Sequence, residues 1–118
     1  MRAYLIDPEQ RSISEVSYNG DFRKITEMLG EGVSAFDCAR FNDEGDAVFV
    51  DDEGLLKEPE WLFRITGYPS PLAGRGLVLG CDMSTGESTA PSVDMEWLRD
   101  NVFLLRRIYH ADSNTDQR

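Results

Sequence analysis

Residues 36–56 read FDCARFNDEGDAVFVDDEGLL, and this stretch decides how the rest of the chain is interpreted. Two short apolar segments flank the turn-forming residues 42–46, a pattern that predicts a β-hairpin. In the second strand Ala47 and Phe49 point to one side and Val48 and Val50 to the other, so both faces are apolar. The hairpin therefore belongs in a sheet that is covered on both faces. The alternative leaves Phe49 on the surface, as an anchor for a partner.

Negative charge is concentrated in and just after this hairpin. Residues 43–60 contain one basic residue, Lys57, and eight acidic residues, a net charge of −7: Asp43, Glu44, Asp46, Asp51, Asp52, Glu53, Glu58 and Glu60. The whole chain carries −10, of which residues 1–60 account for −9. Charge of this sign repels phosphate backbones, so direct nucleic-acid binding is not expected. One face should be strongly negative, unless the fold interleaves the two halves of the chain.

Length and composition set the broad class. A chain of 118 residues that is 41% hydrophobic suits one domain with one core. We predict a single α+β domain over residues 1–110 and a disordered tail over residues 111–118. No apolar run approaches the roughly 20 residues that cross a bilayer, and Asp7 comes too early for a signal peptide. We therefore expect a cytoplasmic protein without membrane contact, in which Cys38 and Cys81 are free, buried thiols rather than a disulfide.

Periodicity and turn residues predict the other elements. Residues 1–7 and 11–18 form a first hairpin, and residues 77–81 form a central strand covered on both faces. Phe22, Ile25, Met28 and Leu29 lie on one face of a short helix that ends at the glycines 30 and 32. Residues 61–66 alternate as a half-buried strand, whereas residues 67–76 and 82–92 read as loops.

The C-terminal segment, residues 93–109, has two interpretations. Its apolar spacing, from Met95 to Tyr109, fits one long helix. The continuous apolar run at residues 102–105 favours a short helix over residues 93–100 followed by a strand, and we prefer this interpretation. The resulting fold is α+β, with a mainly antiparallel sheet of five or six strands and one or two packed helices.

Familiar catalytic and metal-binding patterns do not fit this chain. The single histidine, His110, borders the predicted tail, and Cys38 has no histidine base nearby in the sequence. The acidic residues 43–46 lack the alternate ligand spacing of an EF-hand loop. The glycines 74–80 lead into a strand, whereas phosphate-binding glycines lie between a strand and a helix. We predict no catalytic residues, no metal site and no cofactor.

Several turn and strand signatures resemble those of a family of small proteins from bacteriophages and bacterial mobile elements, the domain of unknown function numbered 3846. They are Leu5-Ile6-Asp7-Pro8, Asn19-Gly20-Asp21, Asp46 to Leu55 and Pro71 to Gly80, and the likeness spans about residues 1–105. The family has no assigned reaction, so the resemblance implies no catalytic residues. It implies a phage or plasmid setting, in which a protein that binds and blocks a host defence or nucleic-acid-handling complex is expected.

Two functional hypotheses follow. The first is a non-enzymatic interaction protein that docks on the basic surface of a partner protein through Asp43, Glu44, Asp46, Phe49, Asp51, Asp52, Glu53 and Trp61. An acidic hairpin that only keeps the protein soluble explains the same charges. The second hypothesis is a small-molecule domain, such as one for a nucleotide signal, in which Arg64, Tyr68 and Arg75 bind an anion beside the loop 68–76. We also consider a homodimer formed through an exposed apolar strand edge.

Overall fold

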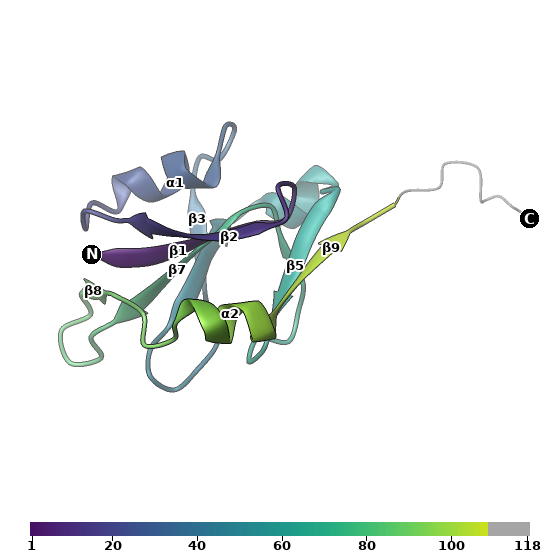
Figure 1. The fold of residues 1–118 in the computed structure, drawn as a ribbon. Coiled ribbons are helices and arrows are strands. Elements are labelled where there is room, and N and C mark those ends of the chain that lie inside the picture. The colour runs from purple at the N-terminus through teal and green to yellow at the C-terminus, as the bar shows by residue number, and fades with distance from the viewer. Residues whose placement is uncertain (109–118) are drawn as a thin grey trace, which may run out of the picture.

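Two antiparallel sheets and two short α-helices make up the part of the chain that the computed structural model describes, residues 1–108 (Figure 1). The larger sheet has the strand order β2-β1-β7-β4-β3, and β8 adds to one end of β7. The smaller sheet has the order β6-β5-β9. The strands are β1 (Arg2–Asp7), β2 (Ser12–Ser17), β3 (Phe36–Arg40), β4 (Ala47–Asp51), β5 (Trp61–Ile65), β6 (Leu72–Ala73), β7 (Gly76–Cys81), β8 (Ser88–Thr89) and β9 (Val102–Arg106). This confirms the predicted α+β class.

The central hairpin forms as predicted. Strands β3 and β4 pair antiparallel, with Cys38 opposite Phe49 and Arg40 opposite Ala47. Strand β4 then pairs with β7, which pairs in turn with β1. The hairpin from residues 36–51 therefore lies at one side of the large sheet, with β3 at its edge, while β7 occupies the centre.

The large sheet separates two apolar layers. On one face Val48, Val78 and Phe63 belong to a core shared with the small sheet and with helix α2 (Met95–Asn101). On the other face Leu77 and Leu79 pack against helix α1 (Arg23–Leu29). Because successive side chains of a strand point to opposite faces, a strand between two layers must be apolar at every position. The predicted double coverage of β4 and β7 is thus confirmed.

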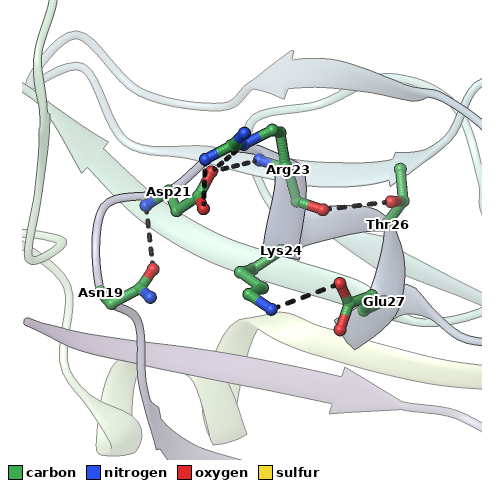
Figure 2. A network of polar contacts seen from close by, with 6 residues as sticks. All are labelled: Asn19, Asp21, Arg23, Lys24, Thr26 and Glu27. Atoms are coloured by element: carbon green, nitrogen blue, oxygen red, sulfur yellow. Dashed lines mark hydrogen bonds and ion pairs between the residues drawn. The ribbon is translucent and has the colours of Figure 1, made fainter.

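Helix α1 begins after a polar turn that Figure 2 shows in detail. Asp21 accepts a hydrogen bond from the backbone N–H of Arg23 at 3.0 Å and forms an ion pair with the guanidinium of Arg23. The side-chain oxygen of Asn19 accepts a bond from the N–H of Asp21 at 2.9 Å. The hydrogen bond and charge of Arg23 lower the pKa of Asp21. The bond from Arg23 satisfies the first N–H group of the helix and fixes where it begins.

The structure corrects the expected face of this helix. Ile25 and Leu29 are buried, as predicted, but Phe22 lies at the N-cap and is 65% exposed. Its backbone angles are helical, with φ of −59° and ψ of −22°, so the side chain is exposed because it lies at the end of the helix, where little of the fold covers it. Gly30 ends the helix with φ of 123°, in agreement with its predicted role as a stop signal.

The C-terminal segment is a helix followed by a strand, as preferred from the sequence. Asp94 caps α2 by accepting a bond from the N–H of Trp97, and β9 starts directly after Asn101. Two of the predicted loops contain short strands, β6 and β8. Each is two residues long and depends on pairing with β5 or β7, which local composition does not reveal. The division into two sheets was likewise not predicted.

His110, Tyr109 and the predicted disordered tail, residues 111–118, lie outside the described residues. Within residues 1–108, no helix has the length and apolar character that a membrane span requires.

Candidate functional site

The acidic residues of the central stretch are divided between the two ends of the β3–β4 hairpin. Asp43 and Glu44 lie in the turn that joins the two strands, which we call the loop end. Asp51 ends β4 at the opposite end, which we call the open end, and Asp52 and Glu53 follow it. A strand rises about 3.4 Å per residue, so the five residues of β4 hold the two groups roughly 15 Å or more apart. The predicted single acidic patch is therefore wrong.

Asp46 is not a surface residue. It is 1% exposed, although the sequence places it among the partner-binding acids. Its carboxylate accepts hydrogen bonds from the N–H of Ser92 at 2.9 Å, the N–H of Val93 at 3.1 Å and the side-chain amide of Asn42 at 3.0 Å. The hydroxyl of Ser92 donates to it as well. Asp46 thus ties the loop end of the hairpin to the segment that leads into α2, and it is corrected from a partner-binding to a structural residue.

The environment of Asp46 stabilises its charged form. Burial by itself would raise the pKa of Asp46, but the hydrogen bonds from Ser92, Asn42 and Val93 outweigh it and lower the pKa. A carboxylate that accepts several N–H and O–H bonds is satisfied in the interior without a basic partner. No ligand is needed to explain this buried charge.

Two of the acids in residues 43–60, Asp51 and Glu60, are neutralised within the molecule. The carboxylate of Asp51 lies 2.6 Å from the ammonium of Lys57. Glu60 lies 2.7 Å from the guanidinium of Arg106, which also stacks over the ring of Trp61 at 5.1 Å from its centroid. Trp61 is only partly exposed and is engaged in this contact. Asp51 and Trp61, both predicted to bind a partner, already have partners in the folded chain.

Phe49 lies inside the layered fold and is not an exposed anchor. It is half-buried and packs against the residues beneath α1, and its ring meets that of Phe36 edge-to-face at 5.4 Å between centroids. The alternative that leaves Phe49 on the surface is wrong, because α1 covers the face of β4 on which Phe49 lies.

At the open end, acidic and apolar side chains together form a surface. We call it the open-end surface and define it by Asp37, Asp52, Glu53, Leu55, Leu56 and Tyr68. Leu55 and Leu56 lie in the 3₁₀ helix η1 (Gly54–Lys57) and are 57% and 83% exposed. Most of these residues line a cavity of about 210 Å³ between η1, the edge of β3 and Tyr68. In the described part of the chain, Asp37, Asp52 and Glu53 form no ion pair.

Sequence reasoning missed three members of this surface: Asp37, Leu55 and Leu56. Asp37 precedes the acidic run and joins it only because β3 pairs with β4, which sets Asp37 opposite Val50. The signal for the two leucines was present, since adjacent apolar residues between Gly54 and Lys57 do not match any strand or helix period. Such a pair next to acids indicates a turn that displays apolar side chains.

The predicted anion-binding residues are not brought together. Tyr68 lines the cavity at the open end, beside Asp37, Asp51 and Asp52 and without a lysine or arginine. Arg64 instead donates to the carbonyl of Pro69. Arg75 forms an ion pair with Asp7 at 3.2 Å, in a different part of the surface. A cavity lined by carboxylates repels a phosphate, so the geometry does not support an anionic ligand at Tyr68.

Both cysteines are free, as predicted, but Cys38 is exposed because it lies on the edge strand β3. The residue as a whole is exposed but its sulfur is partly buried; this partial burial, and after it the nearby Cys81, raise the pKa of Cys38, so the thiolate that would act as a nucleophile is disfavoured. Within residues 1–108, no group of three or more His, Cys, Asp or Glu side chains is arranged to hold a metal ion.

Comparison with known proteins gives one finding. A family model with the description "Domain of unknown function (DUF3846)" matches residues 1–102, from the start of the chain to the first residue of β9. A search of the curated proteins and a search of the solved structures found no match. The match identifies no catalytic family.

Proposed function

Because this chain belongs to the DUF3846 family, a domain of unknown function, we propose its role from its surface: it is a non-enzymatic interaction protein. Its open-end surface binds a segment of a partner protein that carries both basic and apolar side chains. The observation that supports this proposal is the exposure of Leu55 and Leu56 among Asp52 and Glu53, two acids that form no ion pair within residues 1–108.

The two kinds of side chain contribute differently to such an interaction. Acids at the rim of an interface steer a basic partner and raise the association rate, but each adds little affinity. Most of the affinity comes from apolar anchors, and full burial of a leucine side chain is worth about 1.5–3 kcal/mol. Leu56, at 83% exposed, has most of this free energy still to gain on binding. Acids that only conferred solubility would not need exposed leucines among them.

The net charge of −10 supports a partner whose basic surface normally handles nucleic acid. An acidic protein that covers such a surface competes with phosphate groups for the same side chains. We therefore include, in this proposal, a phage or mobile-element protein that inhibits a host defence or nucleic-acid-handling complex. The nucleotide-signal alternative stays a prediction and gains no support from the residues around Tyr68.

The test uses two variants with the same change of charge at opposite ends of the hairpin. The open-end variant is Asp52→Ser with Glu53→Ser, and the loop-end control is Asp43→Ser with Glu44→Ser. Each is immobilised beside the unaltered chain, host lysate is passed over it, and captured proteins are identified by mass spectrometry and re-measured as purified partners. We expect the open-end variant to bind the partner at least about fivefold more weakly at low salt, with the loop-end control unchanged.

A third variant, Leu56→Ser, separates the apolar contribution from the electrostatic one. We expect it to weaken the same partner by about tenfold or more at every salt concentration, since burial of leucine does not depend on ionic screening. Equal binding by all variants would show that the open-end surface is not the contact. Loss confined to the loop-end variant would move the contact to the other end of the hairpin.

A further inference from the structure

Strand β9 is an edge strand: among residues 1–108, no strand pairs with its outer side. In the small sheet it pairs with β5 alone among residues 1–108. Figure 1 shows β9 running away from the body of the molecule beside β5, with no other element along its second edge. Proteins usually protect such an edge with charges, prolines or a very short strand. β9 instead reads Val-Phe-Leu-Leu-Arg over residues 102–106, and its Phe103 and Leu105 are 54% and 38% exposed.

The other sheet edges are of a different kind. β2 (SISEVS) carries three serines and a glutamate beside two apolar residues, β3 (FDCAR) carries an aspartate and an arginine, and β6 and β8 are only two residues long. Among the described edge strands, β9 therefore has the fewest features that oppose pairing with another strand.

The hydrogen bonds to β5 show which backbone groups of β9 face outward. Thr66 N–H donates to the carbonyl of Asn101 at 3.0 Å, and Arg107 N–H donates to the carbonyl of Glu60 at 2.7 Å. Backbone groups alternate in direction along a strand, so the N–H and C=O of the odd-numbered residues point to β5. Those of Val102, Leu104 and Arg106 point to the free edge.

These outward groups are self-complementary when two copies run antiparallel about a two-fold axis at Leu104. Leu104 then faces Leu104 of the second copy, and Val102 faces Arg106. Each of these pairs exchanges two N–H···O=C bonds, and every outward group of the strand is used. Phe103 lies opposite Leu105 of the second copy, on the solvent side of the sheet, with Cα atoms about 4.5 Å apart as in other non-hydrogen-bonded pairs.

The charges along this segment favour the same arrangement. Asp100 precedes the strand, whereas Arg106 and Arg107 end it, so antiparallel pairing brings opposite charges near one another and parallel pairing brings like charges together. Residues 99–108 contain three arginines and one aspartate, and although Arg106 is ion-paired with Glu60, this part of the chain is less acidic than the hairpin. Two copies of the chain therefore repel each other less at β9 than at the acidic hairpin.

We propose that β9 is the interface of a homodimer, in which the small sheets of two copies join into one continuous six-stranded sheet through antiparallel β9–β9 pairing centred on Leu104. This interface is formed by β9 and is separate from the open-end surface. Each copy in the dimer therefore presents its own open-end surface to partners. The proposal is independent of the proposed function.

Charged double variants at the facing positions test the proposal and its register. Phe103→Glu with Leu105→Glu sets like charges opposite one another in the dimer, as does Phe103→Lys with Leu105→Lys. Phe103→Glu with Leu105→Lys sets opposite charges together only if the strands run antiparallel. The exposed Phe22 on α1, changed to glutamate, is the matched control.

Sedimentation equilibrium in 150 mM salt measures the dissociation constant of each dimer. We expect both like-charge variants to raise it by at least about tenfold, and the Glu/Lys variant and Phe22→Glu to stay within about threefold of the unaltered chain. A mixture of the two like-charge variants should form a heterodimer. A chain that stays monomeric at millimolar concentration overturns the proposal, as does a dimer that is insensitive to all changes at 103 and 105.

A cross-linking measurement keeps the test decisive if a charged variant does not fold. In a Cys38→Ser, Cys81→Ser background, Phe103→Cys with Leu105→Cys places thiols of two copies opposite one another. Mild oxidation should give a covalent dimer with 103–105 linkages, identified by mass spectrometry of the peptides. Absence of cross-linking, or linkage of 103 to 103, contradicts the antiparallel register.

Discussion

The two ends of the β3–β4 hairpin carry the same kind of residue and use it in opposite ways. At the loop end Asp46 is buried and accepts hydrogen bonds from a segment 46 positions later in the chain. At the open end Asp52 and Glu53 are exposed beside two exposed leucines. Acids that are adjacent in the sequence therefore need not form one surface, because the role of each carboxylate depends on the hydrogen-bond donors that the fold places near it. If the two ends differ in this way, substitution of Asp46 should lower the stability of the fold far more than substitution at the open end.

Removal of the buried carboxylate should have the largest effect. Asp46→Asn replaces an acceptor of several hydrogen bonds by an amide whose NH₂ group faces the N–H groups of Ser92 and Val93. Leaving such buried donors without acceptors costs about 1–3 kcal/mol each, so we expect a loss of about 3 kcal/mol in the free energy of unfolding. Urea unfolding followed by tryptophan fluorescence measures it.

The matched control is Asp43→Asn, the same chemical change on an exposed residue of the same loop. We expect the thermal midpoint of this control to stay within about 2 °C of the unaltered chain. If the two variants lost similar stability, the hydrogen bonds of Asp46 would not be what holds the loop end in place.

The dependence of stability on pH gives the second test. The pKa of Asp46 is lower in the folded chain than in the unfolded one. Its contribution is therefore fully present above the unfolded value, about 3.9, and is lost as the pH falls through the folded value. The difference in stability between the unaltered chain and Asp46→Asn should be constant from pH 7 to pH 5 and shrink below pH 4. A difference that grows on acidification would have the wrong sign for a carboxylate with a lowered pKa.

The smallest effect is expected at the open end. Lys57→Met removes the ion pair with Asp51 and the hydrogen bond to the carbonyl of Gly32, both of which are made by a flexible lysine side chain that is 43% exposed and screened by solvent. We expect the thermal midpoint to change by no more than about 2 °C at low salt and by less in 1 M salt. A decrease as large as that of Asp46→Asn, measured by differential scanning calorimetry, would remove the distinction between the two ends.

The correct predictions came from features that are local in the sequence. Alternating side chains in β4 and the continuous apolar run of β7 identified strands between two layers, because each side chain direction needs its own apolar neighbour. The apolar run after Asn101 identified β9 as a strand. Phe22 shows where such reasoning stops, since periodicity does not report whether the end of a helix extends beyond the surface that the helix covers.

The candidate site was less accessible to prediction. Asp52 and Glu53 were identified correctly as exposed acids, but Asp37 enters the surface only through the pairing of β3 with β4. Arg64, Tyr68 and Arg75 are close in sequence, and yet the turn between them sends their side chains to different partners. Proximity over ten residues says little about contact when the backbone reverses direction between them.

The longer strands, the two short helices and the α+β class follow from the sequence alone, because hydrophobic periodicity reports directly how many faces of an element are covered; the two-residue strands β6 and β8 do not. Only the tertiary structure decided which acids are buried, paired or exposed, and which strand is left with a free edge. The physical reason is that burial and hydrogen bonding of a charge depend on groups from distant parts of the chain, such as Ser92 for Asp46 and Arg106 for Glu60.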